Sequence, residues 1–480
     1  MGATGLWMLA TLASLLIATG LPAWIVLIGV SLGFAAGGLA AGVLSLPLLT
    51  ALPARLTGLL EHDLLQALPL YVLMGALLNR LPLAEILFRA GWRAMGGGKA
   101  AATMAGLGLG VLLAPMNGSV GASVSILSRT VMPRLDASGM SAERSASVVC
   151  IASTLGIVVP PSLVLILLGD AMLRAHTEAI NATALAVRVI NTQDVFRGAL
   201  MPAAILLVLC ALVAWWQDRG ASDPDARPAA PAVSRGDWAV AGITGIFIAA
   251  LLTSVTLGYL YAVEAAATGG MALMLFGALT RTLTVPILRQ VLRDTMALTG
   301  ALFALLIGAN TFTLILRAYG TDRWVANLLG SLGGNEQLIL AVVLLILGAC
   351  ALVLDAFEMI FVVIPVVLPP LLMQVPDATW VAVLTLLILQ SSFLLPPFGY
   401  AVLMVRHARP LHSRRLTVAL LPFLAVQLTV LFLVIAFPAI VYRDTPIQQP
   451  GTAARLPEPT GDLEKLLQNQ SEDVPGANAK

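Results

Sequence analysis

The stretch that decides the fold reads LLAPMNGSVGASVSILSRTVMP over residues 112–133 and VVCIASTLGIVVPPS over residues 148–162. A polar break at residues 117–119 separates two apolar segments that are each too short to span a bilayer. Farther on, Gly156 and the Pro-Pro pair at 160–161 interrupt a long helix, because proline removes a backbone donor and clashes with the preceding turn. Broken helices at membrane depth are tolerated where they line a cavity, and transporters bind ions or substrate there. The stretch therefore predicts half of a transport site.

The composition indicates an integral membrane protein. Hydrophobic residues make up 59% of the 480-residue chain and charged residues 11%, whereas a soluble domain carries about 25% charged residues. At about 20 apolar residues per crossing, the chain offers roughly ten spanning stretches besides the shorter ones. The charges lie in loops and form no basic patch, so nucleic acid is not an expected partner.

Cysteine and histidine residues offer no metal site. Cys150, Cys210 and Cys350 stand far apart in apolar segments, which predicts free buried thiols rather than disulfides. The histidines stand in loops or at helix ends without the spacing of a ligand pair, and these are His62, His176, His407 and His412. We therefore expect no bound cofactor.

The second half of the chain repeats the plan of the first. A second pair of short apolar segments breaks at Asp355, and a later long helix is interrupted at Pro396-Pro397. The break and the first proline stand 41 residues apart, against 43 residues between Asn117 and Pro160. Breaks at matched spacing predict an inverted repeat, the arrangement that alternating access exploits.

These breaks define the expected domains. The Pro- and Asp-rich residues 218–237 are typical of a flexible linker, and the polar residues 442–480 of a disordered tail. The first repeat is expected at residues 1–217, with a hairpin at 100–133 and a broken helix at 145–169. The second repeat is expected at residues 238–441, with a hairpin at 337–373 and a broken helix at 378–407.

Basic residues predict the orientation. Four of them precede the first hairpin, at positions 80, 89, 93 and 99, whereas Arg323 alone flanks the second hairpin. Because cytoplasmic loops hold the excess of Lys and Arg, we expect the first hairpin to enter from the cytoplasm and the second from outside. Two basic amphipathic segments are expected to lie along the membrane surface, at residues 83–99 and 281–294.

Two carboxylates stand at the second break. Asp355 and Glu358 interrupt the apolar run ACALVLDAFEMIFVVIPVV at residues 349–367. An ionisable residue at membrane depth is costly, so both are candidates for binding an ion or a substrate. The alternative is structural, because Asp355 would also cap the following helix by accepting from its free N–H groups.

Oxygen-bearing side chains gather at the first break. Asn117, Ser119 and Ser123 supply oxygens of the kind that a hard cation such as sodium binds. Gly118 and Gly121 give the backbone the freedom to turn its carbonyls toward such a cation. The alternative is a tight turn that merely reverses the chain.

Further polar residues stand inside apolar segments. Ser153, Thr154 and Gly156 lie beside the first Pro-Pro pair and indicate a cation site, although such hydroxyls also bond back to a preceding carbonyl. Arg129 would either bind a carboxylate bidentately or extend its guanidinium to the membrane interface. Two mid-helix residues are candidates for substrate contact: Asn310 and Thr311.

Several segments together resemble the large membrane subunit of the tripartite ATP-independent periplasmic (TRAP) transporters. They are LPLYVLMGALLNR (68–80), NGSVGAS…RTVMP (117–133), STLGIVVPPS (153–162), VEAAA (263–267), LDAFEMIFVVIPVVLPP (354–370) and QSSFLLPPFGYAVLMVR (390–406). The resemblance extends over about residues 5–441. The last two segments are most similar to the branch associated with 2-oxo acids, mannitol and chloroaromatic acids.

The resemblance implies a fold, a function and partners. The fold would be an all-α integral membrane protein, an inverted-repeat ion-transporter elevator with about ten transmembrane helices and two re-entrant hairpins. The function would be import of a small organic acid across the bacterial inner membrane, with Na⁺ as coupling ion and no other cofactor. A periplasmic substrate-binding protein would deliver the acid, and a separate small four-helix membrane subunit and membrane lipid would be the other partners.

The resemblance also implies two sodium sites. The first would use Asn117 and Gly121 with Gly156, Val159 and Pro161. The second would use the backbone around Asp355 with Ser391, Ser392, Leu395 and Pro397. The hairpin tip reads Asn-Gly-Ser-Val-Gly where the family has a Gly-Ser-Ser type, which leaves open which hydroxyl contacts the substrate. The candidates for substrate contact are Ser119, Ser123, Asn310, Thr311 and Glu358.

Other functions stay open at this point. Proton coupling would use Asp355 or Glu358 as the proton carrier. A channel would not need paired breaks in inverted halves, which favour alternating access. A membrane-embedded enzyme is disfavoured because the chain contains no HExxH motif and no clustered histidines.

Overall fold

The computed structural model describes residues 2–60, 63–113, 119–183, 188–219, 232–331, 335–395 and 399–442. Within these ranges all regular secondary structure is helical, as predicted. The first half of the chain forms α1 (Gly2–Thr19), α2 (Ala23–Ala40), α3 (Leu46–Thr50), α4 (Leu52–Leu60), α5 (Asp63–Arg80), α6 (Leu83–Ala94), α7 (Gly98–Leu113), α8 (Val120–Thr130), α9 (Met132–Ala137), α10 (Ala142–Leu155), α11 (Leu163–Thr183) and α12 (Thr192–Arg219).

The second half continues the helical plan. It forms α13 (Arg235–Leu257), α14 (Ala262–Leu279), α15 (Val285–Ala318), α16 (Thr321–Gly330), α17 (Glu336–Cys350), α18 (Ala356–Glu358), a π-helix η1 (Met359–Val363), α19 (Ile364–Leu372), α20 (Ala378–Ser392), α21 (Tyr400–Ala408), α22 (Ser413–Ala436) and a 3-10 turn η2 (Pro438–Ile440). The expected tail and most of the expected linker lie outside the described residues.

Six described helices are long and apolar enough to cross a membrane, namely α2, α12, α13, α14, α15 and α22. A seventh crossing is possible if α5 and α6, which meet at 66°, form one bent span. The shorter apolar helices include α7 with 16 residues and α17 with 15 residues. At a rise of 1.5 Å per residue they are about 24 Å long or less, which suits arms that turn back within a membrane. The count of about ten crossings stays a prediction.

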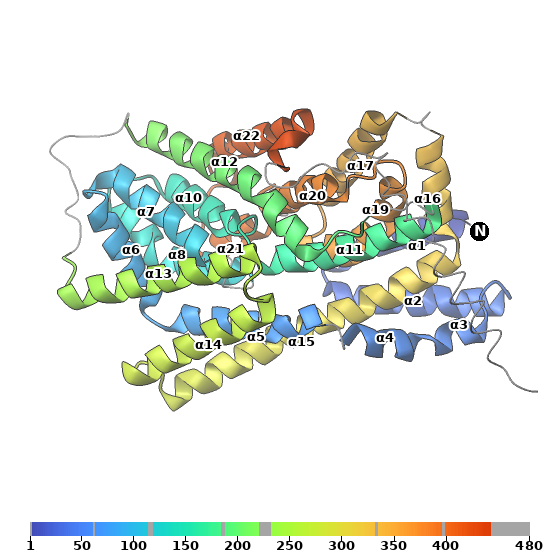
Figure 1. Ribbon diagram of the computed structural model, residues 1–480, viewed down its shortest axis with the longest axis horizontal. Coiled ribbons are helices and arrows are strands. Elements are labelled where there is room, and N and C mark those ends of the chain that lie inside the picture. The colour runs from blue at the N-terminus through green and yellow to red at the C-terminus, as the bar shows by residue number, and fades with distance from the viewer. Residues whose placement is uncertain are drawn as a thin grey trace, which may run out of the picture.

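Helix α15 is the long element that connects the two ends of the molecule. It packs against α2 near one end and against α5, which also packs against α14 (Figure 1). The sequence predicts a separate surface segment at 281–294, and this prediction is wrong, because residues 285–294 are the first turns of the continuous 34-residue α15. No proline follows Pro286 within α15, and proline in the first turn of a helix is well tolerated.

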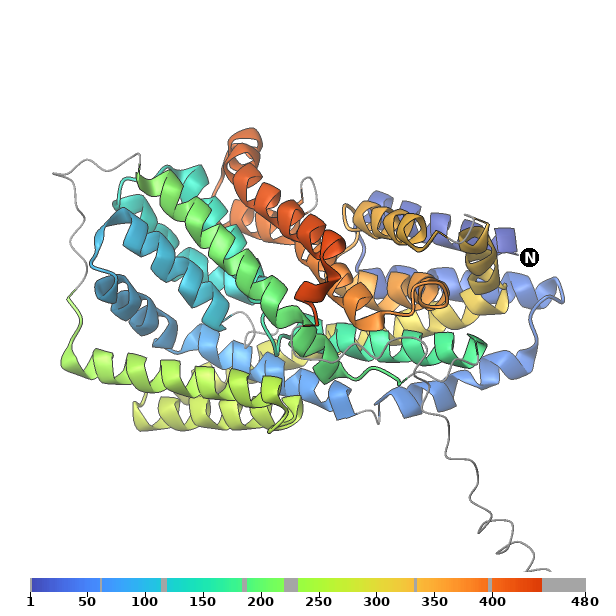
Figure 2. The same cartoon turned by 45° about the horizontal axis from the view of Figure 1, so that its top comes forward.

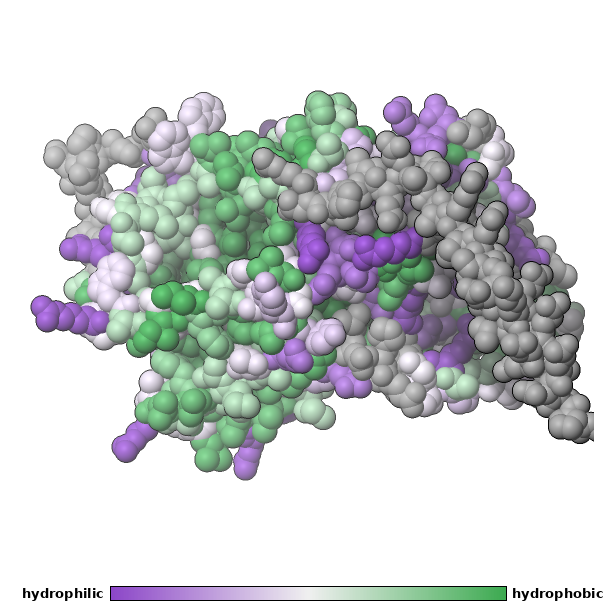
Figure 3. All heavy atoms as spheres, viewed as in Figure 1, coloured by the Kyte–Doolittle hydropathy of each residue, from purple (hydrophilic) through white to green (hydrophobic). Residues whose placement is uncertain are grey.

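The outer face of α13 and α14 is apolar. Ile243 and Ile246 on α13 are 70% and 73% exposed, and Met271 and Leu275 on α14 are also exposed. Figure 3 shows this region as a largely hydrophobic surface, and Figure 2 shows the two helices side by side along one edge of the molecule. Because a soluble protein rarely exposes so extended an apolar patch, lipid is the expected surrounding.

The two broken helices pack in a crossed pattern. The first half of one, α10, lies against α7 and α8, while its second half, α11, lies against α19. The first half of the other, α20, lies against α17, while its second half, α21, lies against α8. Each broken helix therefore contacts both pairs of short apolar helices, one pair with each of its halves.

The first broken helix extends farther than the sequence indicates. The sequence predicts that it ends near residue 169 and that His176 lies in a loop or at a helix end, but α11 continues to Thr183 and His176 is buried within it. The ring of His176 accepts a hydrogen bond from the Ile190 backbone N–H at 3.2 Å. The expectation is wrong because residues 170–183 contain neither glycine nor proline to stop the helix. The cysteines are free, as predicted.

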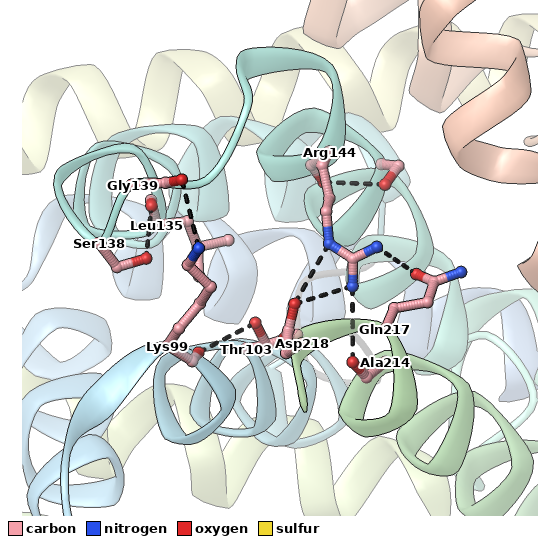
Figure 4. A network of polar contacts seen from close by, with 10 residues as sticks. Lys99, Thr103, Leu135, Ser138, Gly139, Arg144, Ala214, Gln217 and Asp218 are labelled. Carbon is pink, nitrogen blue, oxygen red and sulfur yellow. Dashed lines mark hydrogen bonds and ion pairs between the residues drawn. The ribbon is translucent and has the colours of Figure 1, made fainter. Parts of the chain in front are cut away.

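An ion pair joins the start of α10 to the end of α12. The Arg144 guanidinium donates to the Asp218 carboxylate at 2.8 Å and also to the Gln217 side chain and the Ala214 carbonyl (Figure 4). The Asp218 side chain is 1% exposed and the Arg144 side chain 25% exposed. A nearby group of bonds holds the α7 start to the loop after α9, where Lys99 donates to the Gly139 carbonyl.

Helices α7 and α10 approach closely at a glycine. A Cβ built on Gly110 would overlap the carbonyl oxygen of Ala152, which is backbone and cannot move aside alone. We expect Gly110→Ala to lower the unfolding free energy by about 1–3 kcal/mol, the usual cost of overpacking. Thermal unfolding in detergent measures the effect. The matched control is Gly108→Ala on the same helix, where a Cβ would meet nothing within 4 Å, and an equal loss in both variants would contradict the close approach.

Candidate functional site

The first hairpin tip is built around the start of α8. Asn117 and Gly118 lie outside the described residues. The Ser119 hydroxyl caps α8 by accepting from the Ala122 backbone N–H at 3.1 Å, and the Ser123 hydroxyl donates to the Ser119 carbonyl at 3.4 Å. A cap of this kind satisfies one free donor at the helix start. Ser119 and Ser123 therefore take structural roles, and substrate contact stays a prediction.

Asp355 and Glu358 form a capping box at the second tip. The Asp355 carboxylate accepts from the Glu358 backbone N–H at 2.8 Å, and the Glu358 carboxylate accepts from the Asp355 backbone N–H at 3.1 Å. The predicted cap is therefore confirmed. The arrangement holds two half-buried carboxylates at the first turn of α18. The π-helix of Met359–Val363 follows directly, a turn type that occurs frequently at functional sites.

Four hydroxyls at the ends of α10 and α20 share one geometry. Ser153 and Thr154 donate to the carbonyls three residues earlier, at 2.8 and 3.0 Å. Ser391 donates to Leu387 at 2.9 Å and Ser392 to Leu389 at 2.6 Å. A hydroxyl has one donor and two acceptor lone pairs. Because the donor is used within the helix, each oxygen can serve a third group only as an acceptor or a cation ligand.

The first break is a compact turn between α10 and α11. Gly156 accepts from the Val159 backbone N–H at 3.3 Å, and the Pro160–Pro161 peptide bond is cis. The Ser162 hydroxyl caps α11 by accepting from the Leu165 N–H at 3.1 Å. The structure thus places Gly156, Val159 and Pro161 on one unwound segment, as the sequence predicts.

The second break brings carbonyl oxygens together. A Cβ at Gly399 would lie 2.9 Å from the Phe393 carbonyl oxygen and 3.0 Å from that of Leu395, so only glycine fits here. The Gly399 N–H donates to Leu395 at 2.8 Å, and the Ala401 N–H donates to Phe393 at 3.1 Å. Leu395 is thus placed in an unwound, carbonyl-rich segment beside Ser391 and Ser392. Pro397 lies outside the described residues.

Tyr400 connects the two tips, and the sequence reasoning did not identify it as a site residue. Its hydroxyl lies 2.8 Å from the position of a Cβ on Gly121 of the first tip. The Asp355 carboxylate of the second tip lies within electrostatic range of the same phenol. The sequence feature that could have identified Tyr400 is its position at the start of the helix that follows the second Pro-Pro pair. Tyr400 therefore relates Gly121 of the first half to Asp355 of the second half.

The remaining candidates lie at two hollows beside this region. Asn310 lines a hollow of about 220 Å³, whereas the Thr311 hydroxyl donates to the Ile307 carbonyl of its own helix at 2.8 Å and does not line that hollow. Arg129 donates to the Asn79 side chain on α5 and lines a separate hollow of about 530 Å³ with His407. In the described structure Arg129 therefore holds α8 against α5. This role differs from both predicted roles, which are carboxylate binding and extension of the guanidinium to the membrane interface.

The chemistry of the site is that of oxygen ligands. No group of three or more His, Cys, Asp or Glu side chains among the described residues could hold a metal ion. Carbonyl and hydroxyl oxygens with a few carboxylates suit a hard cation instead. The GxSxG pattern at residues 29–33 lies inside α2, where the Ser31 hydroxyl donates to Leu27, and it does not form the strand-turn-helix that a nucleophilic serine needs.

Comparisons with known proteins identify related sequences. Residues 9–440 match the family model described as "Tripartite ATP-independent periplasmic transporter, DctM component". The C4-dicarboxylate TRAP transporter large permease protein DctM of Rhodobacter capsulatus is 21% identical over 431 residues, which cover 88% of this chain and 95% of that protein. The DctM protein of Pseudomonas aeruginosa is 24% identical over 79% of this chain and 86% of its own length.

Two further proteins show a more limited similarity to this chain. The sialic acid TRAP transporter permease protein SiaT of Haemophilus influenzae is 22% identical over 78% of this chain, but the match spans 59% of that longer protein. The crystal structure of the Alcanivorax borkumensis YdaH transporter superimposes with a TM-score of 0.58 at 16% identity, covering 82% of this chain and 89% of that chain. The latter likeness concerns the fold alone.

Proposed function

The chain belongs to the DctM component family of the tripartite ATP-independent periplasmic transporters, and we propose that it imports a small organic acid by coupling to the sodium gradient. It is thus a large permease subunit, a multi-pass protein of the bacterial inner membrane and not an enzyme. Family members work with a small membrane subunit and a periplasmic binding protein. In this proposal the binding protein hands over the acid, and the small subunit has four helices.

The relation of Tyr400 to both tips carries the proposal. Gly121 and Asp355 come from tips that lie far apart in the sequence, yet the Tyr400 hydroxyl lies beside Gly121 and its phenol lies within electrostatic range of Asp355. Four back-bonded hydroxyls and the carbonyls around Gly399 flank the tips. In our proposal sodium ions bind these oxygens in two sites and order the tips around the substrate. The crossed packing would let the tips move as one body in an elevator step.

The substrate class follows from the relatives and from the site. The names of the relatives specify C4-dicarboxylates and sialic acid, which are both organic acids. We propose a small carboxylate for this chain, and the branch of 2-oxo acids, mannitol and chloroaromatic acids stays a prediction. The start of α8, which has no acidic residue in its first turn, favours a negative charge at the first tip.

Proton coupling is the second candidate, and the capping box favours it. Two carboxylates within one turn at membrane depth would share a proton more readily than two separate ones. Asp355 or Glu358 would then carry the proton. An exchange of the coupling ion separates the two candidates.

Uptake by proteoliposomes tests the proposal. The full-length chain would be reconstituted with its small subunit and binding protein, and radiolabelled succinate, pyruvate and N-acetylneuraminate would serve as probes. We expect accumulation of one probe that stops when external sodium is replaced by choline and survives a proton ionophore. Accumulation that persists in choline and collapses with the ionophore would replace sodium by proton coupling. Full-rate transport by the large subunit alone would contradict the tripartite assembly.

A further inference from the structure

A hollow lined by three arginines lies beside the second tip. It has a volume of about 220 Å³ and is lined by residues of α4, α11, α15 and the segment from η1 to α19. Its charged lining consists of Arg55, Arg174, Arg317, Asp170 and Glu178. We call it the arginine hollow. None of these five residues belongs to the predicted cation or substrate sets.

The charges of the arginine hollow do not balance. Arg174 pairs with Asp170 at 2.9 Å and Arg317 pairs with Glu178 at 2.8 Å. Within the described part of the chain no ion pair involves Arg55, which extends from α4 to the same lining. Among the described residues that line the hollow, three guanidinium groups therefore face two carboxylates. A hollow with one surplus positive charge is complementary to a single carboxylate.

The remaining lining suits the body of an organic acid. Asn310 and Thr313 on α15 add polar groups, whereas Ile360 and Phe361 of η1 and Pro365 of α19 are apolar. Ligand sites typically combine an apolar wall with a few convergent polar groups. The apolar wall belongs to the π-helix that begins directly after Glu358. A molecule in the hollow would therefore touch the second tip.

Arg317 connects three elements at this place. It lies in the last turn of α15, donates to Glu178 on α11 and donates to the Pro365 carbonyl on α19 at 3.0 Å. The side chains of Arg317 and Glu178 are each 34% exposed, so a solute can reach them. A guanidinium binds any carboxylate of matching geometry in the same bidentate way. A carboxylate in the hollow would therefore compete with Glu178 for Arg317.

We propose that the arginine hollow is a binding site for the carboxylate of the transported acid, in which the ligand replaces Glu178 as the partner of Arg317. The inference rests on the proposed import of an organic acid. It adds a site outside the oxygen-rich breaks and gives the ligand a direct effect on the contact between α11 and α15. Loss of the Glu178–Arg317 pair would remove a polar contact between α11 and α15, while Arg317 keeps its bond to the Pro365 carbonyl of α19.

Two variants with opposite expected effects test the site. Glu178→Gln removes the competitor, so we expect the KM for the transported probe to fall severalfold. Arg317→Gln removes the binding group, so we expect the KM to rise about tenfold or more, the usual worth of a charge-assisted hydrogen bond. If the Arg317–Glu178 pair only holds α11 against α15, both variants should change transport in the same direction, and that result would overturn the proposal.

The matched control is Arg323→Gln on α16. No ion pair among the described residues involves Arg323, so this variant should leave the KM unchanged.

A labelling experiment keeps the test independent of transport. Phenylglyoxal modifies exposed arginines. Mass spectrometry of the reconstituted full-length chain measures the extent of this modification at Arg317 and at Arg323. We expect the transported probe, but not chloride, to protect Arg317 alone. Absence of protection would overturn the proposal even if Arg317→Gln fails to fold. If no probe is transported by the unaltered protein, the proposed function fails, whereas protection of Arg317 by one of the three acids would still support the site.

Discussion

Asp355→Ala is expected to raise the sodium concentration for half-maximal uptake by on the order of a hundredfold, the upper range for loss of a charged hydrogen-bonding partner. The substitution removes a carboxylate from the second tip and, at the same time, the acceptor for the Glu358 N–H. Sodium-dependent uptake of the transported probe in proteoliposomes measures the change. Size-exclusion chromatography in detergent shows whether the variant still folds.

The capping role of Asp355 requires a second variant. Asparagine caps a helix about as well as aspartate, so Asp355→Asn keeps the start of α18 and removes only the charge. We expect Asp355→Asn to lose sodium dependence nearly as far as the alanine variant. Normal sodium dependence in Asp355→Asn would show that the residue is only a cap.

Glu358→Gln separates sodium coupling from proton coupling. Glutamine can complete a capping box, so the variant keeps the tip geometry seen between Asp355 and Glu358. With sodium as the coupling ion we expect a modest change in KM and an unchanged response to the ionophore. If Glu358 carries a proton instead, accumulation against a gradient would disappear while exchange of substrate continues.

The sequence predicts the breaks well because local chemistry causes them. Gly156 and the following prolines cannot continue a helix, and Asp355 favours a helix start, so α10 ends and α18 begins near the predicted places. Helix ends without such residues were misjudged. The predicted end near residue 169 and the separate segment at 281–294 relied on polarity alone, yet polar side chains such as that of His176 are compatible with a helix whose backbone bonds are satisfied.

The site was only partly predictable because it depends on packing between distant segments. The oxygens of Ser153, Ser391 and Leu395 could be named from their place beside prolines. The role of Tyr400 depends on Gly121 and Asp355, which are far from it in sequence. The pairing of Arg317 with Glu178 likewise joins residues 139 positions apart. No periodicity in one segment carries such information.

Arg144→Ala is expected to lower the unfolding free energy by about 3 kcal/mol, because it removes the Arg144 guanidinium from the Asp218 carboxylate, which is 1% exposed. The loss would separate the start of α10 from the end of α12 and would also remove the bonds to Gln217 and Ala214. Thermal unfolding in detergent, compared with the unaltered protein, measures the effect as a drop of several degrees in the unfolding temperature.

Two comparisons decide whether burial causes that loss. Arg80 and Asp294 form an ion pair at 2.9 Å whose side chains are 37% and 53% exposed, and Arg80→Ala should cost less than about 1 kcal/mol, as exposed pairs do. The double variant Arg144→Met with Asp218→Leu removes both charges together, and buried pairs replaced in this way often lose little stability. We therefore expect the double variant to be more stable than Arg144→Ala. Equal losses in the single and the double variant would show that packing of the Arg144 side chain, and not the uncompensated charge, stabilises this contact.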